Sequence, residues 1–97
     1  MPTLPTFIDI DGTLTEDPEN AFGLPRYGRI EIVRQMIHSG EEVVLWSARG
    51  RSYVYTFAQK HGLQRALCIS KPSRIVDDNP TIRPMLAVET PEAFFRT

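Results

Sequence analysis

Short, mostly apolar runs recur along the chain and are separated by segments with a different spacing of apolar residues. Runs of this kind are typical of strands buried in a parallel sheet. They lie at residues 7–11, 43–47, 66–70, 74–78 and 85–88. The pattern predicts five strands, several of which end in a polar or acidic residue.

Two of the segments between these runs have apolar residues at the spacing of a helix. Between residues 27 and 39 apolar side chains recur every three or four positions, and Gly40 follows as a C-cap. Residues 52–61 repeat this spacing before Gly62, and Thr90, followed by proline, is an N-cap signal for a terminal helix. The order of elements predicts an α/β fold, a three-layer α/β/α sandwich around a Rossmann-like, mostly parallel sheet.

The composition predicts one small globular domain over residues 1–97. Hydrophobic residues make up 41% of the chain and charged residues 24%, which is typical of a folded protein and not of a disordered one. The net charge of -1 gives no electrostatic signal for nucleic acid or an anionic membrane. The lone cysteine, Cys68, excludes an internal disulfide, and no long apolar run or leader is seen. We therefore expect a cytoplasmic protein without a membrane segment.

Two carboxylates end the first predicted strand. Because side chains alternate along a strand, Asp9 and Asp11 are expected on the same side. Like charges at this separation need a cation, and Mg²⁺ prefers carboxylate oxygens while leaving room for a phosphoryl oxygen. Gly12 permits a turn and Thr13 can bond to the backbone there. The simpler alternative is a strand end followed by an Asp-Gly turn.

The five residues from Asp9 to Thr13, in the order DIDGT, resemble the first motif of the haloacid dehalogenase-like superfamily, whose members are mostly Mg²⁺-dependent phosphatases. The resemblance implies that Asp9 attacks phosphorus to form an aspartyl phosphate and that Asp11 is the general acid and base. A carboxylate is a competent nucleophile once charge is drawn from the phosphoryl group, and a second carboxyl can move the proton.

The segment WSARG, which follows the second predicted strand, resembles the second motif of the same superfamily, where a hydroxyl binds the phosphoryl group. Ser47 is the candidate for that hydroxyl. Arg49 either begins a solvated helix or holds phosphate oxygens. The resemblance implies phosphate binding by Gly12, Thr13, Ser47, Ala48, Arg49 and Lys71.

An apolar strand ending in two acids resembles the fourth motif, which completes the Mg²⁺ site. The resemblance implies metal ligands at Asp9, Asp11, Asp77 and Asp78. Lys71 is the candidate for the third motif, but only two residues separate it from the predicted strand 74–78, whereas a parallel crossover needs roughly a dozen. An extended chain would place Lys71 on the order of 20 Å from Asp77. Either this stretch bends, or Lys71 is structural and Arg49 is the substitute cation.

Residues 15–26 are rich in acids and turn formers and predict a loop over the acid-bearing edge. The loop is either a solvated connector or a cover that closes over a ligand through Phe22 and Leu24. It is too short for the cap domain of larger relatives, as is the segment 52–65. An open site suits a bulky or macromolecular phosphate ester, or completion by a neighbouring subunit in a homo-oligomer.

We therefore expect a Mg²⁺-dependent phosphomonoester hydrolase that acts through an aspartyl phosphate. Its partner is a phosphorylated substrate, either a small molecule or a macromolecule. Two alternatives remain open. One is a nucleotide or nucleic-acid-end phosphatase, and the other is a phosphate-binding or assembly module with little turnover.

Overall fold

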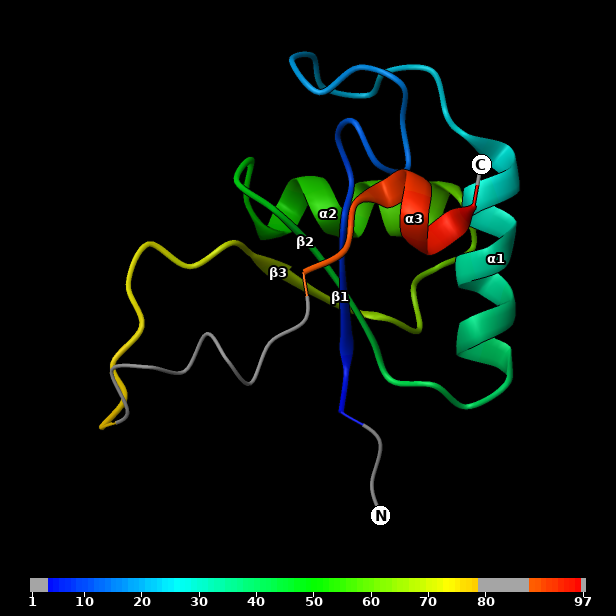
Figure 1. Cartoon of the computed structure of the whole chain (residues 1–97). Coiled ribbons are helices and arrows are strands. Elements are labelled where there is room, and N and C mark those ends of the chain that lie inside the picture. The colour runs from blue at the N-terminus through cyan, green and yellow to red at the C-terminus, as the bar shows by residue number, and fades with distance from the viewer. Residues whose placement is uncertain (1–3, 79–87, 97) are drawn as a thin grey trace.

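The computed structural model describes residues 4–78 and 88–96 of the chain. Three strands alternate with two helices, and a short helix follows near the C-terminus (Figure 1). The elements are β1 (Thr6–Asp9), α1 (Tyr27–His38), β2 (Val43–Ser47), α2 (Arg51–Lys60), β3 (Leu67–Ser70) and α3 (Pro91–Phe95). These elements confirm the predicted α/β class. Among the described residues, no helix has the length and apolar character needed to cross a membrane.

The three strands form one parallel sheet in the order β1-β2-β3. Asp9 is in register with Trp46, and Trp46 with Ile69, so the strands finish at nearly the same level. Because parallel strands run in one direction, their carboxyl ends lie along one edge of the sheet. This carboxyl edge is formed by the ends of β1, β2 and β3 at Asp9, Ser47 and Ser70.

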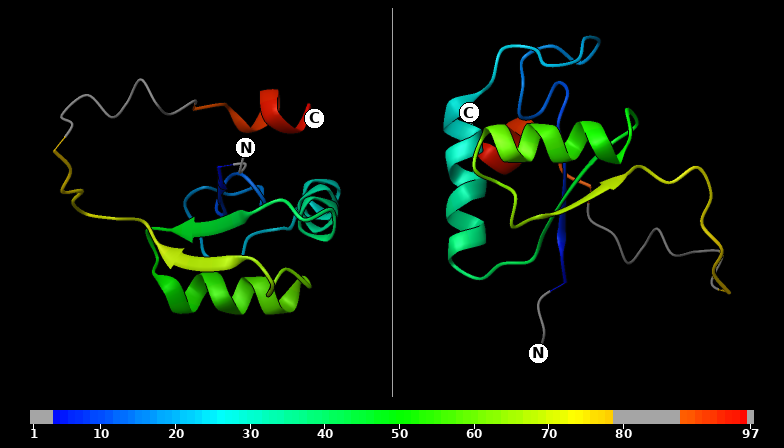
Figure 2. Two further views of the ribbon diagram at one scale, coloured as in Figure 1. Left: turned by 90° about the horizontal axis from the view of Figure 1, so that it is seen from below. Right: turned by 180° about the vertical axis from the view of Figure 1, so that it is seen from behind.

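Apolar side chains of the sheet and the helices make one core. Leu45 of β2, Ile30 of α1 and Phe57 of α2 are each at most 1% exposed, and burying a side chain of this kind stabilises the fold by about 1.5–3 kcal/mol. Helices α2 and α3 lie on opposite faces of the sheet (Figures 1 and 2). Phe95 of α3 joins the core, where its ring centroid lies 5.4 Å from the guanidinium carbon of Arg29.

The predicted strand at residues 74–78 is wrong. Residues 71–78 are exposed and belong to no strand, and the side chain of Val76 is 99% exposed. The chain leaves the end of β3 and runs away from the sheet (Figure 1). No strand forms at residues 74–78 because the few residues after Ser70 are too short a connection to bring the chain back to the start of another parallel strand.

The first predicted strand, at residues 7–11, ends two residues early. β1 stops at Asp9 because the chain enters a tight turn at Ile10, so Asp11 is not a strand residue. The predicted strand 85–88 lies largely outside the described residues, and its described member, Val88, is in no strand.

The terminal helix is confirmed together with its cap. The Ala93 N–H donates to Oγ1 of Thr90 at 3.2 Å, and Pro91 occupies the first helical position.

Candidate functional site

A tight turn directly after β1 shapes the first part of the site. The carbonyl of Ile10 accepts hydrogen bonds from the backbone N–H groups of Thr13, Leu14 and Thr15 at 2.8–3.2 Å. Gly12 has a φ of +81°, a conformation that glycine adopts without strain. Asp11 lies within this turn, so the turn and not the strand determines where its side chain is placed.

The turn is also tied to α1. Arg29 is only 3% exposed, and its Nη1 donates to the Thr13 carbonyl at 2.9 Å. A buried guanidinium needs such acceptors, because a charge taken out of water without partners is strongly destabilising. Arg29 thus connects the core to the segment that carries the two carboxylates.

Asp9 lies beside a lysine. Nζ of Lys71 is 3.1 Å from Oδ1 of Asp9, and the Thr13 hydroxyl donates to Oδ2 at 3.3 Å. Lys71 reaches this position because it directly follows β3 and its backbone N–H donates to the Ser47 carbonyl at 3.0 Å. The large separation considered from the sequence assumed a strand at residues 74–78, and that strand is not formed.

The carboxylate of Asp11 is bound through both oxygens. Nε of Arg49 donates to Oδ2 at 2.5 Å, and the hydroxyl of Tyr53 donates to Oδ1. The Asp11 side chain is 10% exposed, so its carboxylate is largely shielded from water while both of its oxygens accept from a donor. Burial and the hydrogen bond to Asp11 raise the pKa of the Tyr53 hydroxyl, and the hydrogen bond to Asp11 raises the pKa of the Arg49 guanidinium.

Tyr53 was not among the site residues predicted from the sequence. It lies in the first turn of α2, and its side chain reaches the carboxyl edge, where it meets Asp11 beside Arg49. An aromatic residue in an amphipathic helix gives no local sign that its hydroxyl meets an acid 42 positions away.

Ser47 ends β2 and is 3% exposed. Its Oγ accepts a hydrogen bond from the Arg49 N–H at 3.0 Å, which leaves its own proton to donate. Ala48 and Gly50 complete the turn into α2, whose first residue is Arg51 and whose N-cap provides no side-chain hydrogen bond. The positive end of the α2 dipole therefore lies at the carboxyl edge, next to Ser47.

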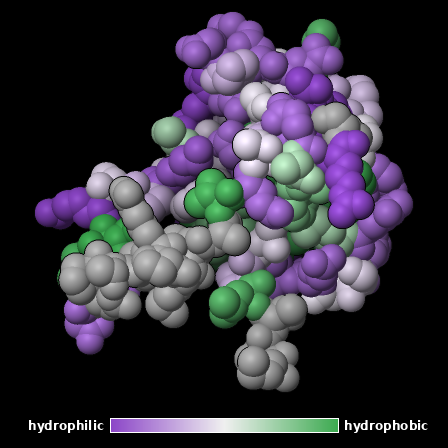
Figure 3. Space-filling view, viewed as in Figure 1, coloured by the Kyte–Doolittle hydropathy of each residue, from purple (hydrophilic) through white to green (hydrophobic). Residues whose placement is uncertain are grey.

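The loop at residues 16–24 lies over this edge. Its ends are closed by the hydrogen bonds from Glu16 N–H to the Leu24 carbonyl and from Arg26 N–H to the Leu14 carbonyl, at 2.9 and 2.8 Å. The middle of the loop is hydrogen-bonded to Arg49 and Tyr53. Its outer surface, at the top of the molecule, is largely hydrophilic (Figure 3).

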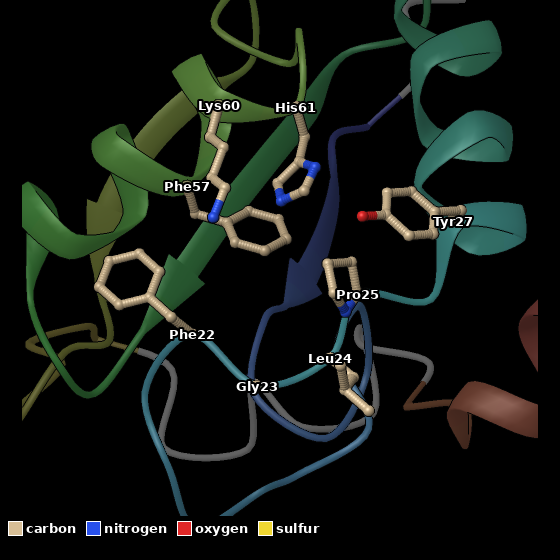
Figure 4. Close-up of a pocket in the computed structure, with 8 residues that line it drawn as sticks. All are labelled: Phe22, Gly23, Leu24, Pro25, Tyr27, Phe57, Lys60 and His61. Atoms are coloured by element: carbon tan, nitrogen blue, oxygen red, sulfur yellow. The ribbon is translucent and has the colours of Figure 1, made fainter.

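A separate cavity of about 150 Å³ lies between the end of this loop and the last turn of α2 (Figure 4). Its rings include Phe57 and His61, whose centroids are 4.5 Å apart, and Tyr27, which is 6.2 Å from His61. Burial lowers the pKa of His61, and the charges of Lys60 and Arg34 act in the same direction. None of the lining residues is a carboxylate of the carboxyl edge.

Asp77 and Asp78 are not brought to this edge. Both lie in the exposed segment that leads away from β3 (Figure 1). Within residues 4–78 and 88–96, no three side chains of histidine, cysteine, aspartate or glutamate are gathered as metal ligands. As placed, the carboxylate of Asp9 is paired with Lys71 and that of Asp11 with Arg49, so each of these two acids faces a cation of the protein.

No family model, curated protein or solved structure matches this chain significantly.

The carboxyl edge combines a half-buried carboxylate with groups that attract anions. Lys71 lies beside Asp9, and Arg49 is paired with Asp11. The Ser47 hydroxyl and the start of α2 follow the end of β2, the strand that pairs with β1. An anionic group that enters here exchanges the present ion pairs for its own. The edge is thus suited to bring a phosphate or a similar oxyanion against a carboxylate oxygen.

Proposed function

We propose that this protein is a phosphomonoester hydrolase that acts through an aspartyl phosphate at Asp9, on a capless three-layer core of the haloacid dehalogenase-like kind. The observation that carries the proposal is the ammonium group of Lys71 at 3.1 Å from the Asp9 carboxylate. It supplies the positive charge that a phosphoryl group needs beside a carboxylate nucleophile. The DIDGT sequence around this carboxylate supports the same chemistry.

In the first step a carboxylate oxygen of Asp9 forms a bond to phosphorus while the bond from phosphorus to the leaving oxygen breaks. Asp11 takes up a proton as its ion pair with Arg49 opens, and it gives this proton to the leaving oxygen, so an alcohol leaves. Lys71 and the Ser47 hydroxyl stabilise the phosphoryl oxygens by charge and by hydrogen bonding.

In the second step water attacks phosphorus and the bond from phosphorus to the Asp9 oxygen breaks. The Asp11 carboxylate takes a proton from the attacking water, which restores its acid form for the next turnover. Inorganic phosphate is released, and Asp9 returns to its ionised state beside Lys71.

Mg²⁺ is the proposed cofactor, on the strength of the sequence resemblance. When bound, it draws charge from the phosphoryl group and favours attack by a carboxylate. The described residues do not gather the four acids Asp9, Asp11, Asp77 and Asp78. The requirement is tested by comparing activity with added Mg²⁺ and with EDTA.

A second candidate is a phosphate-binding module with little turnover. The observation that favours it is the full hydrogen bonding of Asp11, both of whose oxygens face donors. Such a module binds inorganic phosphate without hydrolysing esters, and an assay of turnover separates the two candidates.

The test is hydrolysis of a generic aryl phosphate by the wild type, by Asp9→Asn and by the control Asp17→Asn. Asp17 is a carboxylate of the loop whose Oδ1 accepts the Glu19 N–H at 2.8 Å, a bond that an asparagine oxygen can keep. We expect turnover in the wild type and the control and background rates in Asp9→Asn. Intact-mass analysis of acid-quenched wild type should show a transient adduct of one phosphoryl group. Equal turnover in all three proteins would rule out Asp9 as the nucleophile.

A further inference from the structure

Two side chains at the start of α2 connect Asp11 to the loop at residues 16–24. Tyr53 donates from its hydroxyl to Asp11 and accepts on the same oxygen the N–H of Phe22, at 3.1 Å. One hydroxyl therefore joins the carboxylate to the loop backbone. A tyrosine hydroxyl is suited to this because it donates and accepts at once.

Arg49 makes a second, parallel connection. Its Nε donates to Asp11 at 2.5 Å, while its Nη2 donates to the Glu19 carbonyl at 2.7 Å. The guanidinium carries several donors in a fixed plane, so it holds both acceptors in one orientation. The guanidinium carbon also lies 5.8 Å from the Tyr53 ring centroid, which keeps the two connecting side chains together.

The loop backbone at the point of connection is strained. Phe22 has a φ of +51°, a left-handed conformation that costs a non-glycine residue free energy. Its ring packs on that of Tyr53 with centroids 4.7 Å apart. The hydrogen bond and the ring contact with Tyr53 offset this strain and hold the loop over the carboxyl edge.

We propose that Arg49 and Tyr53 are positioning residues that latch the loop at residues 16–24 onto Asp11, so that the loop and the carboxylate are ordered as one unit. The latch itself stands on the geometry, while its effect on catalysis rests on the proposed function. A carboxylate that moves protons must be held within a small range of positions, and the latch supplies this restraint. When the loop leaves the edge, Tyr53 and Arg49 each lose a partner that fixes their position against Asp11.

The latch is tested first without reference to catalysis, by amide hydrogen exchange of Phe22 measured by NMR. Tyr53→Phe removes the bridging hydroxyl and keeps the ring, and Tyr55→Phe is the matched control on the outer side of α2, where the Tyr55 hydroxyl meets Gln59. We expect the Phe22 amide to exchange on the order of fivefold faster in Tyr53→Phe and at the wild-type rate in Tyr55→Phe. Equal exchange in both variants would overturn the latch.

A second measurement addresses Asp11. In Tyr53→Phe we expect kcat for the aryl phosphate to fall roughly tenfold to a hundredfold, with KM nearly unchanged, because the proton-moving group is misplaced while phosphate binding at Lys71 persists. Arg49→Lys keeps the charge but not the two-acceptor geometry, and should recover only part of the activity that Arg49→Ala loses. A rise in KM alone would contradict positioning of Asp11.

The two proposals fail in different ways. Asp9→Asn is expected to abolish turnover and leave the Phe22 amide as protected as in the wild type. If the wild type has no turnover but Tyr53→Phe loses protection at Phe22, the phosphatase proposal fails and the latch stands. If the wild type is active and Tyr53→Phe matches it in exchange and in kcat, the latch is refuted and the phosphatase stands.

Discussion

Replacing Gly12 by alanine tests whether the turn after β1 depends on the backbone conformation and the space described above. Gly12 has a φ of +81°, and a Cβ placed there would lie 2.7 Å from the Cβ of Pro18. The left-handed conformation costs a residue with a side chain about 1–2 kcal/mol, and crowding against the proline adds typically about 1–3 kcal/mol. We therefore expect Gly12→Ala to lower the free energy of unfolding by about 2–5 kcal/mol.

Gly40→Ala is the matched control. Gly40 has a φ of +90°, and nothing in the structure lies within 4 Å of a Cβ placed there. This variant carries the conformational cost without the contact, so it should lose about 1–2 kcal/mol. Urea denaturation followed by circular dichroism measures both losses. In thermal unfolding the additional loss at Gly12 corresponds to a further decrease of roughly 4–24 °C in Tm. Equal losses in the two variants would refute the contact with Pro18.

Three further predictions concern separate parts of the molecule. Lys71→Met should lower kcat for an aryl phosphate by roughly 10²- to 10³-fold. It should change the free energy of unfolding by less than about 1 kcal/mol, because the ion pair of Lys71 with Asp9 is partly exposed. An unchanged kcat in this variant would contradict the role of Lys71. Phe57→Ala, in the core, should lower the free energy of unfolding by about 3–5 kcal/mol in urea denaturation, and a loss under 1 kcal/mol would argue against the packing described. The pKa of His61 is lowered on folding, so its contribution to stability is complete above its ordinary pKa of 6.5 and is lost as the pH falls below that value. In urea denaturation, the free energy of unfolding should decrease less between pH 7.5 and pH 5 in His61→Gln than in the wild type. Equal decreases would refute the effect of burial.

Local signals in the sequence predicted the elements well where packing and propensity agree. Residues 43–46 are all apolar and Ser47 follows them, and β2 has the predicted bounds of 43–47. Helices α1 and α2 begin and end within one residue of the predicted bounds 27–39 and 52–61, and a glycine follows each of them closely. These features depend on neighbours along the chain, which the sequence shows directly.

The residues around the site were harder to predict because their positions depend on how the chain continues. Asp11 is not part of the predicted strand, because the carbonyl of Ile10 accepts the hydrogen bonds of a turn that ends β1 before it. Lys71 reached Asp9 because β3 ends one residue before it, while the apolar pair Ile75 and Val76 suggested a strand that the short connection does not permit. Tyr53 meets Asp11 only through the packing of α2 on the sheet, and no local pattern encodes that contact.

The position of the single tryptophan gives the protein an internal optical reporter. Trp46 lies at the carboxyl edge next to Ser47, with the ammonium of Lys71 5.8 Å from its ring centroid and the ring of Phe7 at 4.8 Å. A cation near an indole ring perturbs its electronic states, and an anion that draws Lys71 away alters that perturbation. The proposed binding of phosphate at this edge should therefore change the intrinsic fluorescence of the unlabelled chain, which tests it without a chromogenic ester.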